Sequence, residues 1–182
     1  MLKLGVIGTN IITDQMLDAA KKTGKYELTA VYSRTLERAE KFGKPYGATE
    51  FYDDIDKFFE EGDFDVVYIA SPNSLHYQQA RKAIENDKFI IVEKPAFVNP
   101  SEYSAIESLL AAHPKARLVE AARHIHTKIY QAALKKVDEM KEHYIQGATI
   151  NPSFSQSWEI NYRFWFTVNS NGPIYSIYTE VH

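Results

Sequence analysis

The sequence contains no cysteine, and this absence excludes two classes of site. Without thiols the chain can form neither a disulfide framework nor a thiolate metal site, which fits a reducing compartment. No apolar run approaches the roughly 20 residues needed to cross a bilayer. The first apolar segment begins almost at once, so no signal-peptide pattern precedes it. We therefore expect a cytoplasmic protein with no membrane partner.

Charge of either sign is also not in excess. The chain has 21 lysines and arginines against 24 aspartates and glutamates, giving a net charge of −3. Nucleic-acid surfaces need basic clusters that displace counterions, and the basic residues here are spread among acids, so we expect no nucleic-acid partner. A length of 182 residues with 45% hydrophobic content predicts one folded domain, or one domain plus a fragment.

Strand-like and helical patterns alternate through the first two thirds of the chain. The predicted strands are Leu2–Ile7, Glu27–Tyr32, Val66–Ala70, Phe89–Val92 and Arg117–Ala121, with a shorter candidate at Thr49–Phe51. The predicted helices are Ile12–Lys22, Leu36–Phe42, Ile55–Glu61, Leu75–Asn86 and Ser101–Ala112, the last with a start signal at Asn99-Pro100. Such alternation implies βαβ crossovers. The sequence therefore predicts an α/β fold with a Rossmann-type, doubly wound parallel sheet.

The last third of the chain has a different character. Ile125–Lys141 has a helical pattern and Tyr144–Ile150 a strand pattern, and the residues beyond Asn151 are aromatic, strand-like and nearly uncharged. This stretch is too short for an independent domain. We expect a dinucleotide-binding domain over 1–125 and a partial, strand-rich segment over 126–182. Because exposed strand edges pair readily, residues 144–182 predict a homodimer or a larger homo-oligomer.

A turn at Gly8-Thr9-Asn10-Ile11-Ile12-Thr13 follows the first predicted strand. It occupies the place of a G-x-G-x-x-G/A phosphate turn, in which a helix start offers N–H groups to a pyrophosphate. Asn10 and Thr13 replace the second and third glycines, and asparagine tolerates left-handed geometry better than most residues. An ordinary strand-to-helix loop is the alternative interpretation.

The second predicted strand ends at Ser33-Arg34, about 20 residues beyond the glycine turn, where NAD-selective enzymes place an acid. A hydroxyl and a guanidinium suit a 2′-phosphate instead, since the guanidinium fork pairs with phosphate oxygens. These two residues favour NADP, with NAD as the alternative coenzyme. A surface arginine at a helix start is the alternative interpretation, and the position at the strand end favours the functional one.

The third site candidate is the loop Ser71-Pro72-Asn73-Ser74, followed by His76. Proline stiffens the loop, Ser74 can cap the next helix, and Asn73 can hydrogen-bond a ribose or a carboxamide. A lone histidine such as His76 is more often a structural hydrogen-bonding group than a catalyst, so we treat it only as a residue lining the site.

Glu93-Lys94-Pro95 is the candidate for proton transfer. An open parallel sheet binds ligands beyond the carboxyl ends of its strands, and Lys94 follows such a strand immediately before a proline. A lysine amine beside a coenzyme can act as general acid or base, and Glu93 can orient it or bind a coenzyme ribose. A solvated lysine at a strand end is the alternative.

Arg123, His124 and His126 follow the last predicted strand of the sheet. The i, i+2 spacing of the histidines, with no convincing third ligand, predicts no metal site. His126 could contact substrate, although a loop or helix-cap role is at least as common for such a residue.

Taken in order, the motifs G-V-I-G-T-x, Y-S-R, S-P-N-S-L-H, E-K-P and E-A-x-R resemble the Gfo/Idh/MocA (glucose–fructose oxidoreductase/inositol dehydrogenase) family over about residues 1–150. The resemblance implies NAD(P)-dependent hydride transfer on the CH–OH group of a sugar, polyol or dihydrodiol-like small molecule. It also implies a second α/β domain that builds much of the substrate site and the dimer contact. Residues 126–182 would then be a remnant of that domain.

The resemblance also implies roles for individual residues. Gly8, Thr9, Asn10, Ile11 and Ile12 would hold the pyrophosphate, Ser33 and Arg34 the adenosine end, and Ser71, Pro72, Asn73 and His76 would flank the coenzyme. Glu93 and Lys94 would lie at the nicotinamide ribose, and the Lys94–Pro95 peptide bond would be cis. Lys94 would also transfer the proton, and Arg123 would border the nicotinamide pocket. The family's G-G-x-x-x-D-x-G-x-[HY] segment has no convincing match here, since Asn171–Tyr175 fits it poorly. A non-catalytic dinucleotide-binding module is therefore the alternative to an enzyme.

Overall fold

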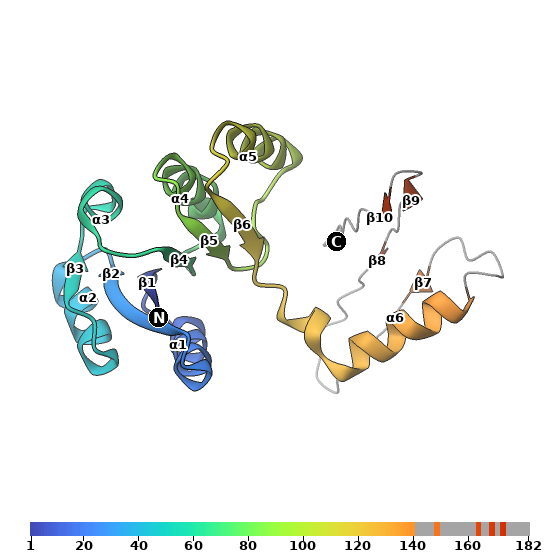
Figure 1. Cartoon of the computed structure of the whole chain (residues 1–182), viewed down its shortest axis with the longest axis horizontal. Helices are drawn as coiled ribbons and strands as arrows, with labels where there is room; N and C mark the ends of the chain where they lie inside the picture. The colour runs from blue at the N-terminus through green and yellow to red at the C-terminus, as the bar shows by residue number, and fades with distance from the viewer. Residues whose placement is uncertain (141–147, 150–162, 165–167, 170–171, 174–182) are drawn as a thin grey trace. The chain divides into compact units, whose positions relative to one another are not determined.

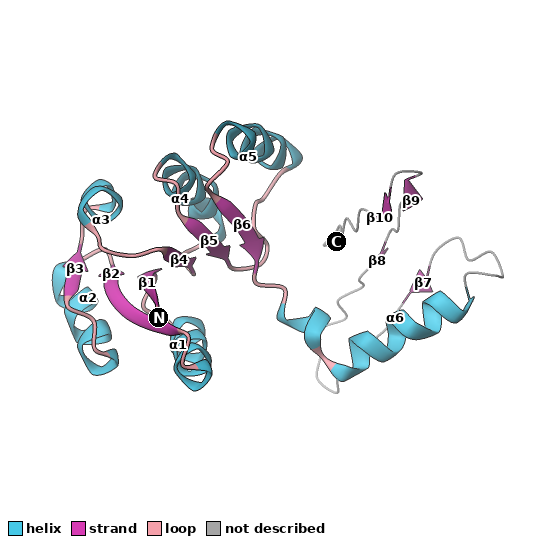
Figure 2. Ribbon diagram, viewed as in Figure 1, coloured by secondary structure: helices cyan, strands magenta, loops and turns pink. Residues whose placement is uncertain are grey.

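The computed structural model describes residues 1–140 and the pairs 148–149, 163–164, 168–169 and 172–173 (Figures 1 and 2). The chain divides into two compact units, Met1–Arg123 and His124–His182, and each is described by itself. In the described residues, no helix combines the length and apolar character that a membrane span requires.

The first unit is built on one six-stranded parallel sheet with strand order β3-β2-β1-β4-β5-β6. Its strands are β1 (Leu2–Ile7), β2 (Tyr26–Tyr32), β3 (Glu50–Tyr52), β4 (Val66–Ile69), β5 (Phe89–Val92) and β6 (Arg117–Glu120). The sheet is wound outward in both directions from the β1/β4 neighbours, which places the topological switch point between these two strands. The predicted α/β fold with a doubly wound parallel sheet is confirmed.

Helices cover both faces of the sheet (Figure 1). They are α1 (Ile11–Thr23), α2 (Leu36–Gly43), α3 (Ile55–Glu61), α4 (Asn73–Glu85) and α5 (Pro100–Ala112), with a short 3₁₀ turn η1 (Lys44–Tyr46). Helices α1 and α2 pack on one face, where Leu17 and Ala39 join a core with the strand residue Val6. Helices α3, α4 and α5 pack on the other, where Phe58, Ala80 and Ile106 join a second core.

Polar side chains fix where most of these helices begin. Asn10, Thr35, Asp54 and Asn99 each accept hydrogen bonds from backbone N–H groups of the first turn of α1, α2, α3 and α5. Helix α4 differs, because it starts at Asn73 after Pro72 and has no side-chain cap. The predicted cap Ser74 was wrong: it lies inside the helix, and the Pro72 carbonyl accepts the Leu75 N–H at 2.8 Å instead.

A short 3₁₀ turn, η2 (Arg123–His126), spans the boundary between the two units. The second unit continues with helix α6 (Lys128–Met140). The single predicted helix over Ile125–Lys141 is therefore interrupted at Thr127, whose hydroxyl accepts the Tyr130 N–H at 3.2 Å and starts α6. Two short antiparallel pairs follow, β7 (Ala148–Thr149) with β8 (Arg163–Phe164) and β9 (Val168–Asn169) with β10 (Gly172–Pro173). The rest of the predicted strand 144–150 lies outside the described residues.

Candidate functional site

The predicted site residues of the first unit follow the carboxyl ends of five strands, at an edge of the sheet that we call the carboxyl edge. The last paired residues stand level across the sheet: Ile7 pairs with both Tyr32 and Ile69, and Val92 pairs with both Ile69 and Glu120. Gly8, Ser33, Ser71, Glu93 and Arg123 each come within three residues of one of these ends. The fold thus gathers segments distant in sequence along one edge, where open α/β sheets bind ligands.

Gly8 fixes the turn between β1 and α1. Its φ of 106° lies in the region that favours glycine, and a Cβ built on it would stand 2.5 Å from the backbone oxygen of Ala70. Any side chain would therefore collide with the end of β4. The close approach of the turn to that strand depends on this glycine.

Asn10 holds the same turn by side-chain hydrogen bonds. Its backbone is extended (φ −115°), so the interpretation that Asn10 replaces a glycine through left-handed geometry was wrong. Its Oδ1 accepts the N–H groups of Ile12 at 2.9 Å and Thr13 at 3.2 Å, while its Nδ2 donates to the Ala70 carbonyl at 2.7 Å. One amide thereby caps α1 and ties it to the end of β4. Thr13, in the place of the third glycine, is fully buried.

The carboxyl end of β2 presents Ser33 and Arg34 in different ways. Ser33 is buried and its N–H donates to Tyr52 O at 3.0 Å, whereas Arg34 is exposed. Arg38, absent from the residues predicted above, donates from Nη2 to Thr9 Oγ1 at 3.4 Å. Arg38 and Lys41 line an open hollow of about 350 Å³ with Thr9 and Phe42. The available sequence signal was the i, i+4 spacing of Arg34 and Arg38.

His76 lies beneath the loops rather than on their surface. Its ring is fully buried, with Nε2 2.9 Å from the Ser71 carbonyl oxygen and Nδ1 3.0 Å from that of Pro95. Ser71 also donates its hydroxyl to Gln79 Oε1 at 2.6 Å, while Pro72 and Asn73 are exposed. The histidine therefore connects the loop after β4 to the turn after β5, which is the structural role weighed above.

Glu93 and Lys94 differ in exposure although they are neighbours. Glu93 is 8% exposed and Lys94 is exposed, and the Lys94–Pro95 peptide bond is cis, as predicted. The Tyr68 hydroxyl donates to Glu93 Oε1 at 2.7 Å, and the Lys94 N–H donates to Glu93 Oε2 at 3.3 Å. Burial raises the pKa of Tyr68, and the hydrogen bond to Glu93 raises it further, while the charge of Arg123 lowers it.

Arg123 reaches back from the end of β6 to α1. Its Nη1 donates to Gln15 Oε1 at 3.0 Å. Its positive charge lowers the pKa of Tyr68. His124 and His126 belong to the second unit, where the His124 ring meets the Tyr130 ring edge-on at 5.5 Å. Among the described residues, no group of three His, Asp or Glu side chains could hold a metal ion.

Exposed apolar side chains accompany the polar groups of the carboxyl edge. Ile11, Leu36 and Leu75 lie in the first turns of α1, α2 and α4 and are 70%, 43% and 45% exposed, and Val98 follows the cis-proline turn with 56% exposed. The edge therefore offers both hydrogen-bonding groups and apolar contact area.

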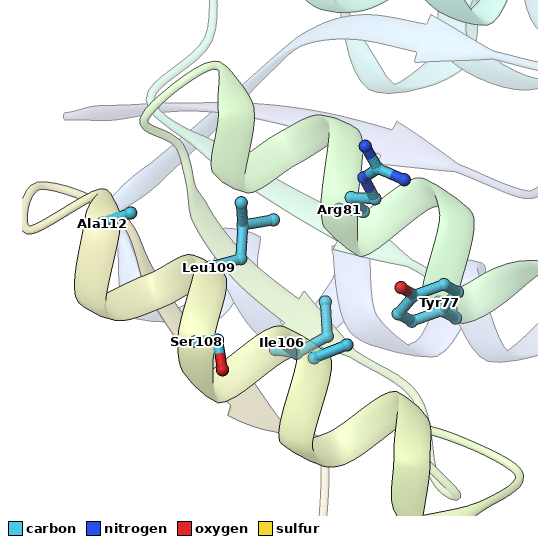
Figure 3. Close-up of a pocket in the computed structure, with 7 residues that line it drawn as sticks. Tyr77, Arg81, Ile106, Ser108, Leu109 and Ala112 are labelled. Carbon is cyan, nitrogen blue, oxygen red and sulfur yellow. The ribbon is translucent and has the colours of Figure 1, made fainter.

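A second hollow, of about 330 Å³, lies between α4 and α5 (Figure 3). Its lining residues are Tyr77, Arg81, Ala105, Ile106, Ser108, Leu109 and Ala112. None of them belongs to the predicted site, so this groove is separate from the residues gathered at the carboxyl edge.

Comparison with known proteins gives a consistent result. A family model described as an oxidoreductase family with an NAD-binding Rossmann fold matches residues 2–120. The uncharacterized oxidoreductase YgjR of Escherichia coli (strain K12) is 43% identical over 105 residues, which are 58% of this chain and 32% of the relative. The scyllo-inositol 2-dehydrogenase (NADP(+)) IolU of Bacillus subtilis (strain 168) is 39% identical over 113 residues, 62% of this chain and 34% of the relative. This chain thus matches about a third of the length of these relatives.

Solved structures have the same fold. An NAD binding oxidoreductase from Klebsiella pneumoniae superposes with a TM-score of 0.69 at 25% identity, covering 76% of this chain and 39% of its own. A scyllo-inositol dehydrogenase from Lactobacillus casei, solved with NAD(H) and scyllo-inositol, superposes with a TM-score of 0.69 at 23% identity, covering 84% of this chain and 46% of its own. At 23% identity, the similarity to the Lactobacillus casei structure is evidence for a shared fold only.

Proposed function

Because this chain belongs to the Gfo/Idh/MocA family of oxidoreductases, we propose that its first unit binds NADP(H) along the carboxyl edge for hydride transfer to or from a sugar or polyol. The observation that carries the proposal is the level alignment of five strand ends. It brings a glycine turn, an arginine pair, a buried carboxylate and an exposed lysine to one edge. Sugar and polyol substrates are suggested by relatives such as scyllo-inositol 2-dehydrogenase and glucose-6-phosphate 3-dehydrogenase.

The turn from Gly8 to Ile12 fits a pyrophosphate. The turn approaches β4 as closely as a glycine permits, and it leads into the positive end of the 13-residue helix α1. The Asn10 side chain occupies the N–H groups of Ile12 and Thr13. A phosphate would accordingly be held by the backbone of the turn before Ile12.

Arg34 and Arg38 favour NADP over NAD. The carboxyl end of β2 carries no acid for a ribose 2′-hydroxyl, and two guanidinium groups stand on either side of the start of α2. Guanidinium groups pair with phosphate oxygens in a bidentate manner. The relative IolU, 39% identical, carries NADP(+) in its name, which supports the same choice.

When bound, the nicotinamide supplies the hydride donor or acceptor. Lys94 is proposed to exchange the proton of the substrate hydroxyl at its Nζ, and Glu93, whose carboxylate accepts the Lys94 N–H, to steady the turn and meet the nicotinamide ribose. Ser71, Pro72, Asn73 and Arg123 would border the coenzyme. His76 would act from below, by holding the two loops together.

The test is a Lys94→Ala variant compared with Lys22→Ala, which removes an exposed lysine in the last turn of α1. Removing a general acid–base group lowers turnover by about 10²- to 10⁴-fold, while NADPH affinity should remain within about threefold. NADPH affinity is measured by fluorescence titration, and turnover is measured by single-turnover hydride transfer with a panel of polyols. Turnover that survives in Lys94→Ala would reject the proton-transfer role.

A non-catalytic dinucleotide-binding module is the second candidate. It is favoured by the lack of a convincing G-G-x-x-x-D-x-G-x-[HY] match in the 182 residues. Wild-type protein that binds NADPH but transfers no hydride to any polyol of the panel would support the module. Wild-type protein that binds neither NADPH nor NADH would reject both candidates.

A further inference from the structure

Tyr68 is a polar side chain in the middle of an otherwise apolar strand. Its neighbours in β4 are Val66, Val67 and Ile69, and its ring is 1% exposed in the core that α1 covers. A phenylalanine would fill the same volume without the cost of removing a hydroxyl from water. The hydroxyl therefore needs an explanation beyond packing.

The partner of that hydroxyl is Glu93, which lies one strand away on β5's carboxyl end. The register pairs Tyr68 with Ile91, so the side chain of Tyr68 reaches along the sheet toward the carboxyl edge. Its Oη meets Glu93 Oε1 at 2.7 Å, and the other oxygen, Oε2, accepts the Lys94 N–H at 3.3 Å. Each carboxylate oxygen has one fixed donor, and the orientation of the carboxylate is thereby set.

We propose that Tyr68 is a positioning residue: its buried hydroxyl orients Glu93 toward the nicotinamide half of the coenzyme. This inference rests on the proposed function. At 1% exposure Tyr68 cannot reach a ligand itself, and it acts only through the carboxylate. Glu93, at 8% exposure, is the member of the pair that reaches the surface beside Lys94.

The surroundings of the pair support this role. Arg123, anchored by Gln15 at 3.0 Å, acts electrostatically on Tyr68 from the end of β6. A buried carboxylate needs hydrogen-bond donors, and Glu93 has donors from Tyr68 on β4 and from the backbone of its own turn. The pair thus links β4 to the end of β5, beside the turn where we propose that the nicotinamide lies.

The test uses two ligands that differ by the half of the coenzyme in question. NADPH contains the nicotinamide ribose, whereas 2′,5′-ADP contains only the adenosine half. A hydrogen bond to a charged group is worth roughly a tenfold change in affinity or more. In Tyr68→Phe we expect the Kd for NADPH to rise about tenfold and the Kd for 2′,5′-ADP to stay within about twofold.

Two variants make the comparison specific. Tyr52→Phe removes another tyrosine–glutamate hydrogen bond, from Tyr52 Oη to Glu50 Oε2 at 3.4 Å on β3, and should leave both affinities unchanged. Glu93→Ala should weaken NADPH alone, and adding Tyr68→Phe to it should change the affinity by less than about twofold, because Tyr68 then has no carboxylate to orient. The backbone amide resonance of Lys94 should shift in Tyr68→Phe and not in Tyr52→Phe, with no ligand present.

Each outcome decides the inference. Equal weakening of NADPH and 2′,5′-ADP in Tyr68→Phe, additive effects in the double variant, or an unmoved Lys94 amide would overturn it. Wild-type protein that binds neither ligand would overturn the proposed function, and with it the role of Tyr68. Wild-type protein that binds both, with Tyr68→Phe indistinguishable from it, would overturn the positioning role alone.

Discussion

At the scale of single residues, Asn10 shows how a turn with one glycine keeps a close approach between a helix start and a strand end. Its Oδ1 caps α1 and its Nδ2 bonds the carbonyl of Ala70, which is also the atom that leaves no room for a Cβ on Gly8. The two residues divide the task. Gly8 provides the space, and Asn10 provides the hydrogen bonds.

This arrangement predicts different effects for two substitutions of Asn10. Both Asn10→Ser and Asn10→Asp keep a capping oxygen and lose the donor to Ala70, so each should lower the free energy of unfolding by about 1 kcal/mol. Only Asn10→Asp adds a negative charge where the pyrophosphate would lie. Its NADPH affinity should fall at least about tenfold below that of Asn10→Ser, as measured by fluorescence titration beside urea unfolding.

The serine variant is the control for the charge. Equal NADPH affinities in the two variants would show that no anion binds at this turn. A loss of stability confined to one of them would show that the shared hydrogen-bond account is incomplete.

Motifs identified several candidate site residues from the sequence alone, whereas the contacts of Tyr68 and Arg38 could not be predicted. Gly8 and Lys94 stand beside strand ends, and strand ends can be found from apolar runs. The contacts of Tyr68 could not be found, because its partner is 25 residues away and only the register of β4 on β5 brings the two together. Arg38 was missed for a related reason: its neighbour Thr9 is 29 residues away.

At the scale of elements, the 3₁₀ turn η1 is joined to α1 by one hydrogen bond. The Tyr46 hydroxyl donates to Asp14 Oδ1 at 2.9 Å. Burial, the hydrogen bond to Asp14 and the negative charges of Asp14 and Asp18 together raise the pKa of Tyr46 to about 12. The contact links two helical segments on the α1–α2 face of the sheet.

Stability should therefore decrease with alkaline pH. Because the folded pKa of Tyr46 lies above the unfolded value of 10.0, its contribution is complete below about pH 10 and is lost as the pH rises to about 12. Tyr46→Phe should make the decline of the melting temperature over this window less steep. Thermal unfolding monitored by circular dichroism between pH 8 and pH 12 measures the difference.

The comparison between variant and wild type is needed because Tyr32, Tyr52 and Tyr68 also have raised pKa values, chiefly through burial. Those three contribute to the decline in both proteins. Identical slopes for Tyr46→Phe and wild type would contradict the contribution of Tyr46.

Periodicity found the elements of the sheet but placed some of their ends incorrectly. Apolar runs identify β1 and β4 because strands covered on both faces are continuously apolar. The start of α4 was misplaced because Pro72 begins that helix with a backbone carbonyl, for which no polar side chain serves as a signal. The interruption at Thr127 was missed because the apolar pattern continues across it.

At the scale of the whole molecule, the first unit contains the candidate coenzyme site, and residues 144–182 are proposed to mediate self-association. The sequence 151–182 holds both tryptophans of the chain and only three residues that are Lys, Arg, Asp or Glu. So few charged residues and so many aromatic ones favour burial against another chain.

We therefore expect the full chain to be a dimer or larger and residues 1–127 to be a monomer that still binds NADPH. Light scattering coupled to size-exclusion chromatography gives both masses, and fluorescence titration gives the affinity. A full chain that stays monomeric at high concentration would reject association through residues 144–182. Loss of NADPH binding in residues 1–127 would show that the site extends beyond the first unit.

Alternation of strands and helices was enough to predict the parallel sheet, because the rules for crossover connections allow only a few topologies for such a sequence of elements. The identity of the substrate could not be predicted in the same way. No motif in residues 126–182 identifies side chains that would select among substrates.

The buried His76 ring, which lies between the carbonyl oxygens of Ser71 and Pro95, has a consequence for the binding of a ligand to these two loops. Because one imidazole lies within hydrogen-bond distance of the carbonyl oxygens of both Ser71 and Pro95, the loop after β4 and the turn after β5 are held together before any ligand binds. A ligand that binds to both segments does not have to order them, because their conformational entropy was already lost during folding. This lowers the entropy cost of binding.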